Sequence, residues 1–270
     1  MSSTELTSTR APRVNAARRL VKRAFRDRDG RFLAEGPQAV REAAAAGRGV
    51  LVELYVTAEA AERYADILAA ARGAGAEVVR ASGEVVASLS GTVTPQGMVG
   101  VCAWRGASLD DLLATRPALV TVLAHARDPG NVGTVIRSSD AAGVGGVVLT
   151  DASVDPLNPK SVRASAGSLF HLPVVTGPRV EDLVPALQAA GLRVLAADGA
   201  GERDLDDLLD DGSLTAPTAW VFGNEAWGLP ESTRALCDDV VRVPIHGRAE
   251  SLNLATAAAI CLYASARAQR

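Results

Sequence analysis

The chain has 270 residues, enough for one large or two modest domains that each bury a hydrophobic core. Its hydrophobic content of 48% and charged content of 22% are typical of a soluble globular protein. No segment approaches the roughly 18–20 apolar residues that a membrane span needs, and we expect no signal peptide because no apolar core follows the first residues. A net charge of -3 argues against a protein that coats nucleic acid without selectivity.

Residues 1–10 are expected to be disordered, and a basic helix is predicted over residues 14–28. Positive charge is concentrated between Arg10 and Arg31, opposed only by Asp27 and Asp29. The basic residues are Arg10, Arg13, Arg18, Arg19, Lys22, Arg23, Arg26, Arg28 and Arg31. Such local positive charge is what phosphate binding requires, since each contact releases counterions. The alternative is a solvated helix face.

The rest of the first half alternates short strands and helices, which predicts a small α/β domain over residues 11–104. Its strands are expected at residues 31–34, 51–56, 77–79 and 97–104, and its other helices at residues 37–45, 58–71 and 84–89. Pro37 suits the first helical position after Gly36. Residues 105–117 have the composition of a linker with room for one short helix.

The second domain, residues 118–270, repeats the order strand then helix, which predicts a parallel sheet with helices on both faces. It opens with an apolar strand at residues 118–126, too continuous to be half exposed. Further strands are expected at residues 145–150, 172–175, 193–197, 219–222 and 240–243. An alanine-rich helix runs almost to the end of the chain.

The three cysteines, Cys102, Cys237 and Cys261, are scattered in apolar runs. Their odd number and their spacing fit neither a disulfide framework nor a zinc cluster. We therefore expect reduced thiols, a cytoplasmic protein and no bound metal.

Three polar, glycine-containing segments follow predicted strands, at the edge where open α/β sheets bind ligands. In the first, DPGNVGTVIRSSD, Gly130 and Gly133 allow close backbone approach, and Arg137 lies about a turn and a half into the predicted helix. The alternative is an ordinary glycine-rich turn with Arg137 paired to Asp140. The segment matches neither GxGxxG nor a P-loop, which disfavours a dinucleotide site.

The second segment, FGNEAWGL, interrupts a buried strand with glycine and two polar residues, which is typical of a ligand-binding loop. Trp227 and Leu229 have an alternative interpretation as cover for the hydrophobic core. The third segment, VPIHGRAESLNLATA, leads into the last helix, with Ser251 expected as its N-cap. Unpaired backbone N–H groups at that helix N-terminus, next to Gly247, make this segment a candidate ligand site as well.

Taken in order and with their spacing, the three segments resemble the motifs of the SpoU (TrmH-like) family of RNA 2′-O-ribose methyltransferases, in the SPOUT class. NVGTVIRSSDAAG resembles the first motif, with an arginine six residues after the asparagine. VFGNEAWGL resembles the second, with Gly-x-Glu, and VPIHGRAESLNLATA resembles the third, with Ser-Leu-Asn at the helix start. Val-Pro-Ile stands where Ile-Pro-Met is usual, an exchange among apolar residues. FLAEGPQAVREA resembles the start of the RNA-binding domain that many members carry.

The resemblance implies a deep C-terminal trefoil knot that binds S-adenosylmethionine, preceded by a smaller α/β RNA-binding domain. The positions that match cofactor-binding residues are Ala197, Gly223, Asn224, Val243, Ile245 and Leu252. The residues expected to bind RNA are Arg18, Arg19, Lys22, Arg23, Arg163 and Ser165.

The catalytic positions that the resemblance implies are Arg137, Asn131, Glu225, Ser251 and Asn253. Arg137 matches the arginine proposed to remove the ribose 2′ proton. Because an arginine normally stays protonated, with a pKa above ~12, it either lies in an unusual environment or only orients the hydroxyl and stabilises charge. The other four match polar groups that position ribose, phosphate or that arginine.

The resemblance therefore predicts a homodimer that methylates a ribose 2′-OH in structured RNA. The extra N-terminal domain favours large-subunit ribosomal RNA over transfer RNA, and both housekeeping and antibiotic-resistance roles are compatible with it. The alternatives are a transfer RNA 2′-O-methyltransferase, an RNA-binding protein with a decayed cofactor site, methylation of a base, or a nicotinamide oxidoreductase on an ordinary doubly wound sheet.

Overall fold

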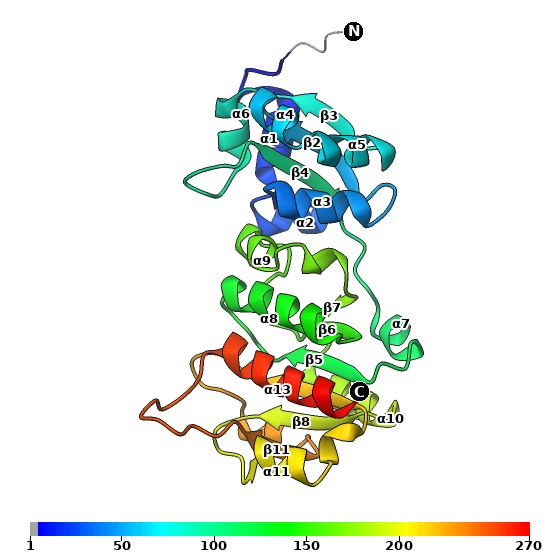
Figure 1. The fold of residues 1–270 in the computed structure, drawn as a ribbon, viewed down its shortest axis with the longest axis vertical. Helices are drawn as coiled ribbons and strands as arrows, with labels where there is room; N and C mark the ends of the chain where they lie inside the picture. Colours follow the sequence, from blue (N-terminus) through cyan, green and yellow to red (C-terminus); the bar gives the residue numbers. More distant parts are fainter. Residues whose placement is uncertain (1–4) are drawn as a thin grey trace. The chain divides into compact units, whose positions relative to one another are not determined.

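The structure is a computed structural model that describes residues 5–270 (Figure 1). The chain divides into two compact units. Unit 1 combines the residues up to Arg105 with the segment Asp155–His171, and unit 2 combines Gly106–Val154 with Leu172–Arg270. The sequence predicted two consecutive domains, so the inclusion of Asp155–His171 in unit 1 is a difference from that prediction.

Unit 1 is built on a four-stranded sheet in the order β1-β4-β2-β3, in which only β2 and β3 are parallel. The strands are β1 (Arg31–Glu35), β2 (Leu51–Val56), β3 (Glu77–Arg80) and β4 (Met98–Ala103). The helices are α1 (Pro12–Arg19), α2 (Arg23–Asp29), α3 (Pro37–Ala45), α4 (Ala58–Arg63), α5 (Ala65–Gly73), α6 (Gly83–Leu89), α9 (Pro159–Ala164) and the short η1 (Ser168–Phe170).

The single basic helix predicted over residues 14–28 is wrong, because the chain breaks it into α1 and α2. The break frees the carbonyls of Leu20 and Val21, and both accept hydrogen bonds from Nη1 of Arg26, at 2.9 and 2.7 Å. Arg26 Nη2 also lies 2.6 Å from a carboxylate oxygen of Asp155, and the Arg26 side chain is only 3% exposed. A buried, paired guanidinium stabilises the turn between the helices, so Arg26 is unavailable to phosphate.

The predicted disordered tail lies partly outside the described residues, which begin at Glu5. Leu6 forms a parallel bridge with Ala81, and its N–H donates to the carbonyl of Arg80 at 2.8 Å. The described end of the tail is therefore attached to the edge of the unit 1 sheet at β3.

The segment Asp155–His171 packs against β1 and α3 of unit 1. Phe170 stacks on Phe32 with ring centroids 5.8 Å apart. Gly167, with φ of +100°, lies so close to α3 that a Cβ atom would come within 2.4 Å of Glu42 Cγ. Ser165 is 1% exposed and donates its hydroxyl to the Val162 carbonyl. The expected RNA contact of Ser165 is therefore corrected, since a buried hydroxyl that serves its own helix is out of reach of RNA.

Unit 2 is a seven-stranded, wholly parallel sheet in the order β7-β6-β5-β10-β8-β11-β9. The strands are β5 (Leu119–Leu123), β6 (Gly146–Leu149), β7 (Val174–Thr176), β8 (Arg193–Ala197), β9 (Arg203–Asp204), β10 (Thr218–Phe222) and β11 (Asp239–Arg242). The helices are α7 (Leu109–Ala114), α8 (Pro129–Ala142), α10 (Val180–Ala189), α11 (Leu205–Asp210), η2 (Ser213–Thr215), α12 (Glu231–Arg234) and α13 (Leu254–Ala268). The predicted parallel α/β fold is confirmed.

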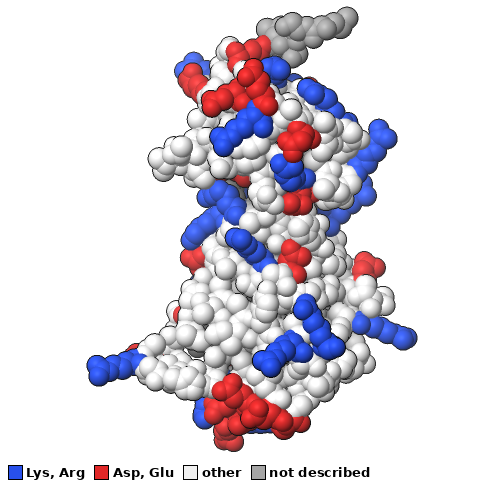
Figure 2. Space-filling model, in the orientation of Figure 1, with Lys and Arg blue, Asp and Glu red and all other residues white. Residues whose placement is uncertain are grey.

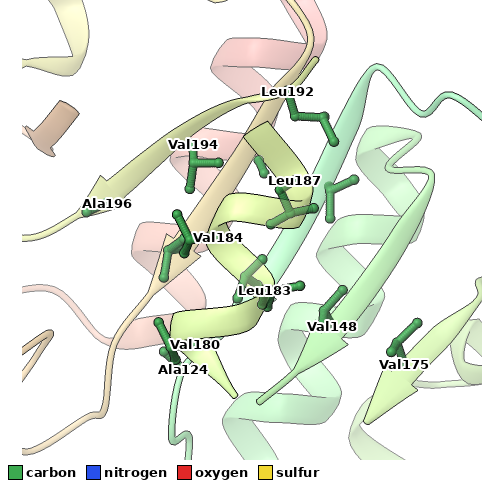
Figure 3. Packing of buried hydrophobic residues seen from close by; sticks show 14 of the residues in the cluster. Ala124, Val148, Val175, Val180, Leu183, Val184, Leu187, Leu192, Val194 and Ala196 are labelled. Atoms are coloured by element: carbon green, nitrogen blue, oxygen red, sulfur yellow. The ribbon is translucent and has the colours of Figure 1, made fainter. Parts of the chain in front are cut away.

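Strand β10 shows how the sheet separates its two faces. Ala219 and Val221 join the core under α10, where Leu183 and Leu187 pack against the neighbouring strands (Figure 3). The intervening Trp220 faces α13 instead, and its indole N–H donates to the Ser265 hydroxyl at 2.8 Å. Side chains alternate along a strand, so β10 presents apolar residues to both faces of the sheet, and helices cover both faces. The polar residues that could carry chemistry therefore lie in the loops.

Acidic side chains gather over α11 at one end of unit 2 (Figure 2). Arg242 of β11 donates to both carboxylate oxygens of Asp204, and this hydrogen bonding lowers the pKa of Asp204 below its ordinary value. The ion pair fastens the short edge strand β9 to β11.

None of the helices within residues 5–270 combines the length and the hydropathy that a membrane span needs.

Glu35 provides a test of how the segment Asp155–His171 is held. Its carboxylate accepts hydrogen bonds from the Ser90 and Thr92 hydroxyls, from the Gly91 N–H at 3.0 Å and from Arg163 Nη1 at 3.2 Å. Partial burial raises the pKa of Glu35, but these donors outweigh it and leave the pKa below its ordinary value. A lowered folded-state pKa contributes stability above the unfolded pKa, and that stability is lost as the pH falls through the folded pKa.

We expect Glu35→Gln to reduce the free energy of unfolding by about 1–3 kcal/mol at pH 7. The difference from the parent protein should shrink as the pH falls from about 5 to 3, as measured by urea unfolding. Glu62→Gln, an exposed change on α4, is the control and should be neutral. A deficit for Glu35→Gln that stayed constant with pH would contradict the assignment.

Candidate active site

The loops that follow β8, β10 and β11 enclose a cavity of about 450 Å³ in unit 2. Because these strands are parallel and adjacent, their carboxyl ends open at the same edge of the sheet. The lining residues are Ala197, Asp198, Gly199, Phe222, Gly223, Asn224, Glu225, Ala226, Gly228, Val241, Val243, Ile245, Glu250, Ser251, Leu252, Asn253, Leu254 and Ala257. The volume is within the range of small-molecule sites.

All six residues expected to bind the cofactor line this cavity, although they come from three separate loops. Three of the expected catalytic residues, Glu225, Ser251 and Asn253, line it as well. Val243, Leu252 and other aliphatic residues form apolar walls, and the polar side chains come from the second and third motif segments and from Asp198 in the loop after β8. The cavity therefore offers an apolar surface for a ring system and polar groups for its substituents.

The Glu225 carboxylate joins the second motif segment to the first. It accepts hydrogen bonds from the backbone N–H groups of Arg127 and Asp128, both at 3.1 Å, and from Asn131 Nδ2 at 3.2 Å. These donors lie just before and within the first turn of α8, where backbone N–H groups have no helical partner and favour negative charge. Glu225 therefore fixes the loop after β10 against the N-terminus of α8.

Asn131 and Asn253 join the first segment to the third. Asn253 Nδ2 donates to Asn131 Oδ1 at 3.1 Å. Asn253 Oδ1 accepts from the N–H of Ala255 at 2.8 Å, which makes Asn253 the N-cap of α13. The predicted cap at Ser251 is wrong, because the helix begins at Leu254 and Ser251 stays in the loop that lines the cavity.

The loop after β10 has a fixed backbone. Asn224 and Gly228 exchange N–H···O hydrogen bonds of 2.9 Å in each direction. The Asn224 side chain, 5% exposed, donates to the His125 carbonyl at 2.8 Å and accepts from the Ala226 N–H. A Cβ atom on Gly223 would lie 2.3 Å from the carbonyl carbon of Gly228, so only glycine fits there. The close approach of residues 223 and 228 therefore requires the glycine of the Gly-x-Glu motif.

Ala197 was expected at the cofactor, but the role of its neighbour Asp198 was not predicted. Its carboxylate accepts hydrogen bonds from the N–H groups of Ala200 and Leu229 and from Arg234 Nη1, at 2.9, 3.1 and 3.3 Å. Asp198 thus ties the loop after β8 to the loop after β10. The available signal was an aspartate directly after a buried strand, at the ligand-binding edge of the sheet.

Arg137 lies outside the cavity lining. It stands on α8, two turns or less from Asn131, and its side chain is exposed. In the part of the chain that the structure describes, its guanidinium has no hydrogen bond or ion pair. The described residues also contain no cluster of His, Cys, Asp or Glu that could hold a metal ion.

The two roles of Asn253 can be separated by substitution. Asn253→Ala removes both the cap and the donor to Asn131, whereas Asn253→Asp retains the capping oxygen. We expect the alanine variant to lose about 1 kcal/mol of unfolding free energy and the aspartate variant to keep most of it, as measured by urea unfolding. Ser251→Ala should leave the stability unchanged. Equal destabilisation by Ser251→Ala would contradict the cap assignment.

Comparison with known proteins matches these features to one family. The model of the SpoU rRNA Methylase family matches residues 118–263, and that of the MRM3-like substrate binding domain matches residues 11–100. A solved structure, the AdoMet-bound rRNA methyltransferase from Sinorhizobium meliloti, superposes with a TM-score of 0.83 at 31% identity, covering 98% of each chain.

Two curated relatives have names that specify the methylated nucleotide. The 23S rRNA (uridine(2479)-2′-O)-methyltransferase of Streptomyces viridochromogenes is 38% identical over 178 residues, which cover 64% of this chain and 61% of the relative. The 23S rRNA (guanosine(2553)-2′-O)-methyltransferase RlmP of Bacillus subtilis is 32% identical over 96% of this chain and 98% of its own. The chain described here therefore belongs to the SpoU rRNA methylase family.

Proposed function

We propose that this protein transfers a methyl group from S-adenosylmethionine to a ribose 2′-hydroxyl of large-subunit ribosomal RNA. The observation that carries the proposal is the hydrogen-bonded series Glu225–Asn131–Asn253, which joins the three motif segments beside the cavity. The two curated relatives are named for different nucleotides, a uridine and a guanosine. What they share is the 2′-oxygen, and this supports a ribose acceptor over a base.

The cavity fits the proposed cofactor. Ala197, Gly223, Asn224, Val243, Ile245 and Leu252 are the residues proposed to hold it. Their aliphatic side chains suit an adenine ring, and the backbone groups of the loops after β10 and β11 suit its polar edge and the ribose. S-adenosylmethionine, when bound, supplies an electrophilic methyl group.

Arg137 is the residue proposed to act on the ribose hydroxyl. Arginine side chains carry a fixed positive charge in proteins, so we assign Arg137 to orienting the 2′-oxygen and stabilising the charge that develops there. Its place on α8, the helix that also carries Asn131, supports this role. Asn131, Glu225, Ser251 and Asn253 are proposed to position the ribose and its phosphate.

The C-terminal trefoil knot and the homodimer also belong to this proposal. After β11 the chain passes through residues 243–253 into α13, which packs on α8 (Figure 1). A Cβ atom on Gly201 would lie 2.7 Å from the Val240 carbonyl, so the loop between β8 and β9 lies close against β11, which stands between those two strands in the sheet. Ile260 and Tyr263 leave an apolar surface exposed on α13, which supports pairing of two copies. Ribosomal RNA as substrate supports action in the cytoplasm.

The proposal is tested by transfer of labelled methyl to unmodified ribosomal and transfer RNA, with the modified nucleoside mapped afterwards. The parent protein should label a ribose of large-subunit RNA, and Arg137→Ala should lower kcat by at least about 100-fold. Its affinity for S-adenosylmethionine, measured by calorimetry, should stay within about twofold because Arg137 lies outside the cavity. Full activity of Arg137→Ala would contradict the catalytic assignment, and label only in transfer RNA would contradict the substrate.

The RNA-binding surface proposed for unit 1 comprises Arg18, Arg19, Lys22 and Arg23, all exposed on or beside α1 and α2. Arg13 is excluded, because its guanidinium lies 2.9 Å from Glu77 and 3.4 Å from Glu53. Both signs of charge are interspersed over this unit (Figure 2). The proposed RNA-binding surface therefore consists of these four cations only. The match to a substrate binding domain at residues 11–100 supports its role in RNA binding. Arg163, which is paired with Glu35, stays a prediction.

The double variant Arg19→Gln, Lys22→Gln should weaken binding of large-subunit RNA and lower the slope of log Kd against log salt concentration by about 1–2, one unit or less for each lost phosphate contact. Fluorescence anisotropy of labelled RNA over a salt series measures both quantities. Arg72→Gln on α5 removes an exposed charge from the same unit and serves as the control. An unchanged slope in the double variant would remove this surface from the proposal.

A further inference from the structure

Trp227 is 54% exposed, in contrast to the aromatic residues of the strand before it. Trp220 and Phe222 of β10 are 0% and 1% exposed, and Leu229 is 3% exposed. The interpretation that this segment covers the core is therefore right for Leu229 and wrong for Trp227. A single exposed apolar side chain needs no explanation by itself, so the surroundings of the indole decide what it can do.

The backbone holds Trp227 at the edge of the cavity without help from the indole. Its neighbours Ala226 and Gly228 both line the cavity, whereas Trp227 does not. The paired hydrogen bonds of Asn224 and Gly228 close the loop, and Glu225 fastens it to the N-terminus of α8. The ring is thus presented beside the cofactor cavity by a fixed support, which limits the entropy lost when a ligand binds to it.

The guanidinium of Arg127 lies over this ring, 5.2 Å from its centroid. The same residue's backbone N–H donates to Glu225, so the two segments meet through both backbone and side chain. Arg127 is exposed, and within the described part of the chain its guanidinium forms no ion pair. A cation–π contact at an exposed site is weak, and it leaves the positive charge able to bind an anion.

We propose that Trp227 and Arg127 bind a nucleotide of the substrate RNA next to the one that is methylated. Trp227 stacks on its unpaired base and Arg127 contacts its phosphate. The inference rests on the proposed function. An aromatic ring with an adjacent arginine matches the chemistry of an unstacked nucleotide, which offers a π face and a negative charge. The cofactor is excluded as occupant because the indole does not line the cavity.

A second copy of the chain is the competing occupant, and the structure favours RNA over it. The exposed apolar residues Ile260 and Tyr263 lie on α13, and no described cation lies over the Tyr263 ring. Trp227 belongs to a polar loop at the ligand-binding edge of the sheet and is paired with a cation. A two-fold contact centred on this cation would bring two guanidinium groups together, which is unfavourable.

The test compares the full-length parent with Trp227→Ala, Trp227→Phe and Arg127→Gln, using an unmodified large-subunit ribosomal RNA transcript. Trp227→Ala should raise the KM for RNA and the Kd about tenfold, within the range expected for loss of one base–aromatic stack. Trp227→Phe should stay within about threefold of the parent, because a smaller ring still stacks. Arg127→Gln keeps the backbone bond to Glu225 and should lower the salt slope by about 1.

A second measurement locates the contact. RNA should quench the part of the tryptophan emission that Trp227→Phe removes, whereas S-adenosylmethionine alone should not. Calorimetry with S-adenosylmethionine should give the same affinity for all variants. These results would support the inference.

Unchanged RNA affinity and KM in Trp227→Ala, with an active parent, would overturn this inference and leave the proposed function standing. Dissociation of Trp227→Ala into monomers in sedimentation would overturn it in favour of a contact between copies. An inactive parent would overturn the proposed function and the inference together. Quenching by S-adenosylmethionine alone would assign the indole to the cofactor instead.

Discussion

The Glu225 carboxylate is the group on which the arrangement of the site depends. It satisfies two backbone N–H groups in front of α8 and the Asn131 amide, all contributed by a segment more than ninety positions earlier in the sequence. Without it these exposed donors would have only water as an acceptor, and the net contribution of a typical intramolecular hydrogen bond is about 0.5–1.5 kcal/mol. An ionised acceptor at a helix N-terminus is also favoured by the helix dipole. The same carboxylate therefore positions Asn131, which meets Asn253, and the loop that presents Trp227.

Much of this arrangement follows from the sequence, because parallel strands bring their carboxyl ends to one edge. The apolar runs of β5, β8, β10 and β11 indicated strands, and the polar residues after them could then be expected to meet. Glu225, Ser251 and Asn253 do meet at the cavity. The choice of Asn253 over Ser251 as N-cap was not predictable, because both residue types cap helices well and only the tertiary contact with Asn131 separates them. Asp198 was missed for the same reason, since two of its three donors, Leu229 and Arg234, lie more than thirty positions away in the sequence.

Unit 1 shows where local patterns fail. A run rich in arginine between residues 14 and 28 has the periodicity of one helix, yet Arg26 turns inward to bind two carbonyls and Asp155. Asp155 and Phe170 belong to a segment inside residues 118–263, the region that matches the SpoU rRNA methylase model. No local sequence signal therefore connects them to β1 or α2. The chain consequently passes between the two units three times, at Arg105, Asp155 and His171. Deleting the first 105 residues would uncover Asp155 and the ring of Phe170, so unit 1 is a discontinuous structural unit.

The distribution of aromatic residues connects the fold to recognition. Only 4% of the chain is aromatic, and β10 uses Trp220 and Phe222 for the core under α13. Five residues beyond Phe222 the same chain places Trp227 in solvent, although Leu229, two residues further along the loop, is buried. Phosphate contacts from exposed arginines contribute affinity with little sequence information, so the basic residues of α1 and α2 cannot by themselves select a nucleotide. The stacking proposed for Trp227 would add a contact beside the cavity that is made only when the RNA strand is unpaired at that position. Selection of an unpaired position would then come from the loop that carries Glu225, and affinity for the RNA backbone from unit 1.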